Sequence, residues 1–379
     1  MTKKKVVQPL EHDPSKFSTN RELLENFGLI LTDNRSFRPV GSMTLILSGM
    51  LHYSLRVILT YHELELLTVM KVLHLTLIYL LVAVCGTVVL RQSKRFLVLH
   101  SIIRNGFYKY PQGLTDEQLM IRSRANEKVL KITKYGLRFF VIATLGSTLK
   151  EPLPYDFQVW TRQYNGWFPF VVDSWSKYVV SQIYHLMAAL SAALLGGSVC
   201  IVFIAIAEHL LAQLEILSIS LKNAIHDVPD PGDSRANYLA YLKIKSCVKH
   251  HHVILRFFIE FQKYYSIPVL SMLAGTTVAM CTIAFVVTDP NSTFGVSAAF
   301  LSLMAPEIAF CLCYCTYGQK ITDMGFNVRD TVCNAPWYCH SKKVQLALLM
   351  ILIKTRTPLT LTAAGLKDCS IKSIGEVRL

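Results

Sequence analysis

Long runs of residues without a formal charge restrict what this chain can fold into. Val72–Leu90 is a run of 19 residues without Asp, Glu, Lys or Arg, and Val179–Ala207 is a run of 29. A helix that crosses the hydrocarbon core of a bilayer needs about 20 mostly apolar residues, so each run is long enough to span a membrane. With 52% hydrophobic and only 17% charged residues, the 379-residue chain is poorly suited to form two soluble domains. We therefore expect an all-α membrane protein.

Two more spans are predicted in the second half of the chain. Tyr264–Thr288 has 25 residues free of formal charge, and Phe294–Tyr317 has 24 residues with one acid, Glu307. Only Asp289–Thr293 separates them, which predicts a tight hairpin between the two helices. An ionisable residue inside a span is a candidate functional residue. Glu307 is either part of a structural ion pair, with Arg138 as a possible counter-ion, or part of a functional site.

Two weaker candidates carry basic residues within the apolar run. Ser42–Thr60 contains Arg56 close to its end, and Ile132–Leu149 contains Lys134 and Arg138. Long basic side chains near a helix end can extend to the headgroups while their stems stay in the apolar layer. Arg138 lies nearer the middle of its span, so it needs a protein partner or a hydrated crevice.

The last apolar segment is too short to cross a bilayer. Val344–Ile353 has only ten residues before the polar stretch Lys354–Gly365 interrupts it. A broken helix is tolerated at membrane depth only where protein or a water-filled cavity satisfies its open backbone. We interpret this region as two half-helices that meet near Pro358, which makes seven transmembrane helices with the last one split.

The distribution of Lys and Arg predicts the orientation of the chain. Twenty-seven of these residues fall in the amino-terminal segment and in the loops on one side of the spans, whereas four fall on the other side. Because cytoplasmic loops carry the excess of basic residues, the amino terminus is predicted to be cytoplasmic and the carboxyl terminus extracellular. The formal net charge of +14 is then explained without a nucleic-acid partner. The basic start has no apolar run behind it, so no cleaved signal peptide is expected.

This organisation predicts five consecutive parts. They are a cytoplasmic amino-terminal segment, helices 1–4 with the ligand-pocket region, a cytoplasmic loop with helical extensions, helices 5 and 6, and a cytoplasmic anchor with the split helix 7. Their residues are 1–41, 42–212, 213–263, 264–317 and 318–379, respectively.

Several function classes fit the sequence poorly. The predicted orientation is the inverse of a G-protein-coupled receptor, and no cysteine lies between Lys150 and Tyr178 to pin an outer loop. No phosphate-binding glycine loop, His-Glu-x-x-His or Gly-x-Ser-x-Gly occurs, so we expect no enzyme. A secondary transporter remains an alternative, because discontinuous helices also bind substrates at the midplane, although the two halves show no repeat.

A histidine triplet is the most conspicuous candidate for a metal site. His250, His251 and His252 are adjacent, with Cys247 three residues before them. Adjacent residues point to different faces of a helix, so the triplet makes a poor chelate and we expect no metal and no cofactor. A pH-sensitive patch is the better interpretation.

Four motifs in the second half of the chain resemble the insect odorant receptor family. Pro358–Gly365 reads Pro-Leu-Thr-Leu-Thr-Ala-Ala-Gly and is similar to the Pro-Leu-x-Leu-x-Ala-Gly loop that splits the last helix of the family. Cys313–Gln319, followed by Asp330–Tyr338 with its final Trp-Tyr pair, resembles the inner segment before that helix. Glu208–Leu217 resembles the end of the fourth helix, and Cys247–His252 resembles the start of the fifth.

The resemblance implies a subunit of a tetrameric, ligand-gated, non-selective cation channel in the plasma membrane of olfactory sensory neurons. A tuning subunit of the family binds a small volatile odorant and assembles with the Orco co-receptor, while membrane lipid surrounds both. Orco resembles the same fold but has a much longer loop before the fifth helix, whereas residues 213–264 are short, so this chain resembles the tuning type. A gustatory-receptor-like channel is the nearest alternative, but the Thr-Tyr and Gln-Phe pattern of such receptors is missing after Trp337.

The resemblance also implies where the sites lie. The ligand pocket is expected in the outer half of the bundle, although ordinary helix packing would explain the same residues. The candidate pocket residues are His74, Tyr79, Phe140, Ala143, Gly146, Tyr184, Met187, Phe300 and Met304. The candidate pore or gating residues are Pro358, Gly365, Ser370 and Ile374, and the candidate subunit-anchor residues are Gln319, Trp337 and Tyr338. The chain stops earlier after Ser370 than the family does, which indicates either a shortened product or a subunit whose partners supply the gate.

Overall fold

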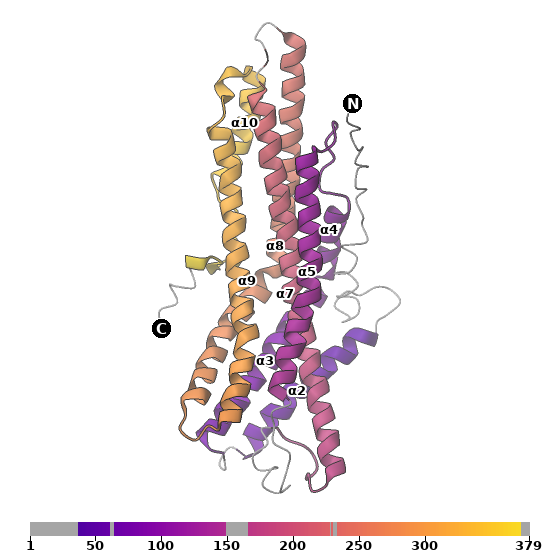
Figure 1. Ribbon diagram of the computed structural model, residues 1–379, viewed down its shortest axis with the longest axis vertical. Coiled ribbons are helices and arrows are strands. Elements are labelled where there is room, and N and C mark those ends of the chain that lie inside the picture. The colour runs from indigo at the N-terminus through magenta and orange to yellow at the C-terminus, as the bar shows by residue number, and fades with distance from the viewer. Residues whose placement is uncertain (1–36, 61–63, 149–165, 228, 230–232, 373–379) are drawn as a thin grey trace, which may run out of the picture.

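The computed structural model describes residues 37–60, 64–148, 166–227, 229 and 233–372. They form an elongated bundle of helices with one small β-hairpin (Figure 1). The elements are α2 (Phe37–Thr60), α3 (Leu66–Arg91), α4 (Ser93–Arg104), α5 (Asp116–Thr148), α7 (Trp175–His226), α8 (Ser234–Thr288), α9 (Phe294–Cys333), the 3-10 helix η2 (Trp337–Cys339), α10 (Lys342–Thr355), β1 (Thr362–Ala363) and β2 (Lys367–Asp368).

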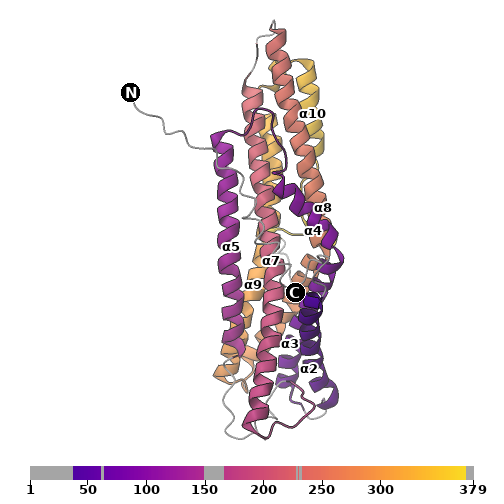
Figure 2. The ribbon, with the colours of Figure 1, turned by 90° about the vertical axis from the view of Figure 1, so that its right-hand side faces the viewer.

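The two ends of the bundle are formed by different helices. Three long helices, α7, α8 and α9, run along most of the bundle, and α10 packs against α8 and α9 at one end (Figures 1 and 2). Helices α2 and α3 occupy the other half, which also holds the connection between α8 and α9. We call these the α10 end and the distal end.

Within the residues that the structure describes, five helices are long and apolar enough to cross a membrane: Gly41–Leu59 of α2, and α3, α7, α8 and α9. The break between α8 and α9 falls between Thr288 and Phe294, as the sequence predicts. Helix α5, which contains the predicted third span, is not among the five, and its Lys134 and Arg138 are both exposed. These helices agree with a multi-pass helical membrane protein, whereas the count of seven spans and the orientation stay predictions.

Helix α8 is much longer than a membrane span, and its two ends have local explanations. The side chain of Asp233 caps its first turn by accepting hydrogen bonds from the backbone N–H groups of Arg235 and Ala236, both at 2.9 Å. Its uncharged part, residues 264–288, is the part that can span a bilayer, and residues 234–263 extend the helix towards the α10 end. Pro268 lies inside the helix and is buried.

Aromatic side chains from α7, α8 and α9 form the centre of the core. The ring of Phe203, which is fully buried, contacts the rings of Phe261, Tyr265 and Tyr314 at centroid distances of 5.3, 5.1 and 4.6 Å. Most of these contacts are edge-to-face or tilted, which is the favoured geometry for aromatic pairs. Tyr265 also donates a hydrogen bond of 3.1 Å from its hydroxyl to the carbonyl oxygen of Val199. The three long helices are thus held together at mid-length.

A buried carboxylate connects α5, α7 and α9. Glu208 on α7 is 7% exposed, and it pairs with Lys128 of α5 and accepts a hydrogen bond from the hydroxyl of Tyr317 on α9. Two partners compensate the loss of hydration that burial imposes on the carboxylate.

The region after α10 departs from the expectation of two half-helices that meet near Pro358. Helix α10 ends at Thr355, before the proline as predicted, but the second half-helix does not begin there. A hairpin of β1 and β2 follows, and helix resumes only at Ile371. Ala364 and Gly365 have φ of 51° and 73°, and the N–H of Leu366 bonds the carbonyl of Ala363 at 2.9 Å, which is the geometry of a type I′ turn. Glycine adopts this conformation without steric cost, which explains Gly365.

The segment around this hairpin contacts both α8 and α9. The amide of Gln262 donates to the hydroxyl of Thr362 at 2.7 Å, and the hydroxyl of Thr322 donates to the carbonyl of Leu359 at 3.1 Å. The backbone of Cys369 passes directly against Gly318 of α9. The segment that the sequence assigns to the gate is therefore attached to the same helix that continues into the distal half of the bundle.

Candidate ligand pocket

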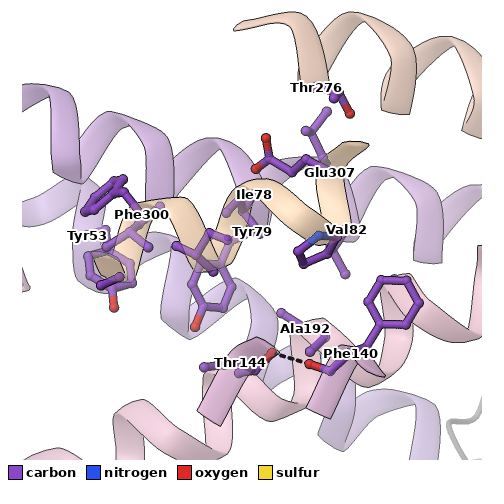
Figure 3. Close-up of a pocket in the computed structure, with 18 of the residues that line it drawn as sticks. Tyr53, Ile78, Tyr79, Val82, Phe140, Thr144, Ala192, Thr276, Phe300 and Glu307 are labelled. Atoms are coloured by element: carbon purple, nitrogen blue, oxygen red, sulfur yellow. Dashed lines mark hydrogen bonds between the residues drawn. The ribbon is translucent and has the colours of Figure 1, made fainter. Parts of the chain in front are cut away.

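A cavity of about 440 Å³ lies among the helices of the distal half. It is large enough for a small organic molecule, since ligand pockets commonly measure about 300–1,000 Å³. Helices α2, α3, α5, α7, α8 and α9 all contribute to its walls (Figure 3). The described residues that line it are Tyr53, Leu75, Ile78, Tyr79, Leu81, Val82, Phe140, Thr144, His185, Ala189, Ala192, Ala193, Gly196, Met272, Thr276, Thr293, Gly295, Val296, Ala299, Phe300, Leu303, Pro306, Glu307 and Phe310.

Small residues on α7 make the space, and aromatic residues from the other helices border it. Ala189, Ala192, Ala193 and Gly196 occur at helical spacing on one face of α7, where larger side chains would fill the cavity. Phe140 and Phe310, which both line the cavity, stack with their ring centroids 5.1 Å apart. The result is an apolar cavity with a few polar groups, which is the usual composition of a site for a small apolar ligand.

Three of the predicted pocket residues line this cavity, namely Tyr79, Phe140 and Phe300. The structure places the other six beside it or elsewhere. His74 is fully buried and contacts the ring of Phe300 at a centroid distance of 5.3 Å, and Met304 packs near the same phenylalanine. Ala143 and Gly146 are half-buried on α5.

The two predicted residues on α7 lie outside the lining. The hydroxyl of Tyr184 donates to the hydroxyl of Ser48 at 3.1 Å, and its ring contacts His52 on α2 at 5.5 Å. Met187 exposes 51% of its surface. Helix α7 has both a face towards the pocket and an exposed face. Its sequence does not show directly which residues point inward.

The structure also brings in residues that the sequence did not single out. Tyr53 on α2 and His185 on α7 both line the cavity, and the Tyr53 hydroxyl lies 2.6 Å from Nε2 of His185. Thr276 reaches it from α8 and Thr144 from α5, and the Thr144 hydroxyl donates to the carbonyl of Phe140 at 2.9 Å. The only sequence signal for these residues is a polar side chain within an apolar run, a feature shared by many residues that merely pack.

The acid of the sixth span lies at the edge of the pocket. Glu307 is 7% exposed, and its Oε1 lies 3.6 Å from Nε2 of His74 on α3. The expected counter-ion, Arg138, is exposed on α5, and its guanidinium lies over the ring of Tyr135. His74 is therefore the neighbour of Glu307, because the rotation of α5 turns Arg138 away from the interior. Helix α9 continues through Pro306 without a break.

The remaining candidate residues lie at the α10 end or around the β-hairpin. Pro358 and Gly365 are exposed in the segment around the hairpin, Ser370 is half-buried, and Ile374 lies outside the described residues. The amide of Gln319 donates to Asp323 at 2.7 Å. Trp337 and Tyr338 expose 40% and 68% of their surfaces.

The histidine triplet has a structural role in this conformation. His250 is 1% exposed, and its ring lies between the Tyr110 hydroxyl at 2.8 Å and the Gln213 side-chain oxygen at 3.1 Å. His251 is buried as well, whereas His252 is exposed, so the three rings point in different directions. No group of three or more potential metal ligands occurs in the part of the chain that the structure describes.

Fold and cavity together are those of a multi-pass helical bundle with an internal cavity large enough for a small molecule. A family model described as "7tm Odorant receptor" matches residues 65–374. The chain therefore belongs to the insect odorant receptor family, which confirms the resemblance seen in its motifs. The family consists of receptors, so the chain is an olfactory membrane protein and not an enzyme.

Individual relatives agree with this assignment. Odorant receptor 43b of Drosophila melanogaster is 22% identical over 263 residues, which are 66% of this chain and 61% of that protein, so the match spans less than two thirds of this relative. The olfactory receptor OR5 of Machilis hrabei, solved in complex with eugenol, superposes with a TM-score of 0.74 at 16% identity, over 95% of this chain and 93% of that one. A second structure of the same receptor has a TM-score of 0.72 at 15% identity and covers 95% of each chain.

Proposed function

We propose that this chain is the odorant-binding subunit of a ligand-gated cation channel and that its ligand occupies the cavity in the distal half. The observation that carries the proposal is the cavity itself, whose volume of about 440 Å³ and mostly apolar wall suit a small volatile molecule. The relative solved with eugenol shares this fold, which supports a small odorant as the ligand.

Helix α9 provides a direct connection from the pocket to the proposed gate. Phe300, Glu307 and Phe310 line the cavity, and Gly318 and Thr322 on the same helix contact the segment that forms the β-hairpin. A ligand opens a channel only if it binds the open state better than the closed state. A ligand that shifts or rotates α9 would move the hairpin with it, so the one helix can couple binding to the pore.

The exposed surface at the α10 end suits subunit contacts. Trp337 and Tyr338 are exposed, as are Leu346, Leu349 and Met350 on α10. Large exposed apolar groups that lie together mark contact surfaces, and aromatic residues are enriched in such contacts. We propose that they anchor the chain to the Orco co-receptor. The connection between α7 and α8, residues 227–233, is short, which supports the tuning type of subunit.

The proposal includes an orientation, with the distal end outside the cell and the α10 end in the cytosol. The basic residues Lys222, Arg235, Lys243, Lys245 and Lys249 all lie near the α10 end of α7 and α8, which agrees with the rule that basic loops face the cytosol. An epitope inserted after Asn291, in the exposed connection between α8 and α9, should then be labelled by antibody on intact cells. Labelling only after permeabilisation would reverse the orientation.

The decisive test is a measurement of ligand-evoked current. Cells that express this chain with Orco should pass a cation current when a small odorant is applied, whereas cells with Orco alone should not respond to the same odorant. A chain that reaches the surface and accumulates a labelled ligand without a ligand-triggered current would instead be a transporter.

A further inference from the structure

One wall of the pocket presents hydrogen-bond acceptors without donors. Glu307 lines the cavity, and its side chain is 10% exposed. Neither of its carboxylate oxygens has a hydrogen-bond partner among the described residues. Buried polar atoms in folded proteins almost always have a partner, so a pair of unsatisfied oxygens beside a cavity points to a partner that enters the cavity.

His74 does not supply this hydrogen-bond donor, because the hydrogen bonds around its ring leave Nε2 without a proton. The Thr282 hydroxyl donates its proton to the carbonyl of Ala279 at 2.7 Å, and its oxygen lies 2.8 Å from Nδ1 of His74. This pattern assigns the ring N–H to Nδ1, from which it can donate to the Thr282 oxygen. A neutral imidazole carries only one N–H, so Nε2 is an acceptor.

The two acceptors face each other. Nε2 of His74 lies 3.6 Å from Oε1 of Glu307, and this nitrogen also has no hydrogen-bond partner in the described part of the chain. A protonated ring and a carboxylate would approach to about 2.8 Å. The longer separation fits a neutral ring that offers the carboxylate no donor.

The wall supplies no positive charge either. None of the described residues that line the cavity is a Lys or an Arg, and the other polar side chains are hydroxyls and the imidazole of His185. In such apolar surroundings the carboxyl group of Glu307 is ionised only beside a charged or strongly donating partner. The cavity wall therefore lacks a group that has several N–H donors and a positive charge, and a ligand could supply it.

We propose that the pocket takes a small primary amine, whose nitrogen donates to Glu307 and whose carbon skeleton fills the apolar part of the cavity. The proposal rests on the proposed function of this cavity as the odorant site. An ammonium group has three donors and a charge, whereas an alcohol has one donor and no charge. An ester or ketone has only acceptors, which would face the carboxylate oxygens unfavourably.

Aromatic neighbours favour the same ligand. Phe300 and Tyr79 line the cavity together with Glu307 (Figure 3). The face of an aromatic ring attracts an ammonium group within about 6 Å. The rings therefore suit both the charged nitrogen and the apolar skeleton attached to it.

The test compares matched ligands on the intact channel. Cells that express the full chain with Orco are exposed to a panel of primary amines, linear and aryl, each paired with the alcohol and the methyl ester of the same skeleton. For at least one skeleton the amine should activate at a half-maximal concentration at least about tenfold lower than that of the alcohol, as expected for a charged rather than a neutral hydrogen bond.

A matched pair of substitutions assigns the effect to one carboxylate. Glu307→Gln keeps the shape of the side chain and one acceptor oxygen but removes the charge, so it should lower the preference for the amine over its alcohol to about onefold. Glu127→Gln makes the same chemical change on the exposed surface of α5, where Glu127 pairs with Lys131, and should leave the preference as in the wild type.

The possible results separate the two proposals. Amines that are no better than their alcohols in the wild-type channel would overturn this inference while the proposed function stands, and this comparison needs no variant to fold. An amine preference that survives Glu307→Gln, with surface labelling equal to that of the wild type, would overturn it too. A channel at the surface that answers no member of the panel and no other odorant would contradict the proposed function itself.

Discussion

The backbone of Cys369 lies directly over Gly318 of α9, so closely that a β-carbon on Gly318 would overlap the Cys369 carbonyl group. Cys369 follows β2, and its N–H bonds the carbonyl of Leu361 at 2.8 Å, so the contact fixes both strands of the hairpin to the helix. Gly318 is therefore required because of the close approach of two backbones, and not because of its dihedral angles.

Gly318→Ala should separate the hairpin from α9. A backbone carbonyl cannot move aside as a flexible side chain can, so the added methyl group should reduce stability by about 1–3 kcal/mol, as overpacking in a core does. If the hairpin couples α9 to the pore, the ligand-evoked current of the variant should be lost or greatly reduced while protein remains at the surface. Thermal unfolding in detergent and whole-cell current measure the two effects.

Gly41→Ala is the control for this substitution. Gly41 is a helical residue of α2 with nothing within 4 Å of the position of an added β-carbon. Alanine is a better helix former than glycine, so stability and current should stay the same or rise slightly. A wild-type current in Gly318→Ala would contradict the proposed role of the hairpin contact.

Substitutions in the pocket should change ligand selectivity more than surface expression. Tyr79→Ala and Phe300→Ala each remove an aromatic wall of the cavity, which should raise the half-maximal concentration of a fitting odorant by about tenfold and admit bulkier ones. Met187→Ala, at a half-exposed position outside the lining, should leave the response spectrum unchanged. Equal effects of all three substitutions would show that the odorant site lies elsewhere.

The sequence predicts the long helices well because uncharged runs and their interruptions are local features. The break between α8 and α9 follows from five residues, Asp289–Thr293, that cannot continue an apolar helix. The end of α10 before Pro358 follows in the same way, because the residue before a proline disfavours the helical conformation. The sequence does not predict the hairpin, because Ala364 takes a positive φ that alanine rarely adopts and its turn therefore has no clear sequence signal.

The pocket was less predictable than the helices because it depends on how each helix is rotated. Glu307 is recognisable as an acid in an apolar run, but its neighbour His74 is on α3, and only the packing of α3 against α8 and α9 shows that His74 and not Arg138 lies beside it. Tyr53 and His185 line the cavity for the same reason. A single sequence contains no measure of these rotations.

The connection between α7 and α8 should be insensitive to pH in the physiological range. Lys243 donates a hydrogen bond of 2.6 Å to Asp227, which lowers the pKa of this carboxyl below its usual value of 3.8. A lowered pKa in the folded state means that the contribution to stability is present above the unfolded pKa and is lost as the pH falls through the folded pKa. The pair should therefore stay intact from neutral pH down to about pH 4.

Asp227→Asn tests this prediction. Both side chains are more than one-third exposed, so the substitution should lower the free energy of unfolding by less than about 1 kcal/mol. The difference in thermal stability between variant and wild type should be the same at about pH 7.5 and 5.5. A difference that disappears between these values would show that a group with a near-neutral pKa controls the pair.

Replacing Lys128 and replacing Glu208 should lower the free energy of unfolding by different amounts, although the two residues form one ion pair. Lys128 exposes 47% of its side chain, whereas Glu208 exposes 8%. Lys128→Met leaves the carboxylate with Tyr317 as its remaining partner in a buried site, which should cost about 2 kcal/mol. Glu208→Gln leaves a lysine that water can solvate and an amide oxygen that still accepts from Tyr317, so it should cost about 1 kcal/mol.

The double variant completes a thermodynamic cycle that separates the pair from its surroundings. Lys128→Met combined with Glu208→Gln should cost less than the sum of the two single substitutions, because the uncompensated buried charge is absent from it. The exposed pair Glu127–Lys131, with 65% and 66% of the two side chains exposed, is the reference, and each of its substitutions should change the stability much less, with little coupling. Additive costs at Glu208 and Lys128 would show that the carboxylate is solvated and that α5, α7 and α9 are held together by apolar packing alone.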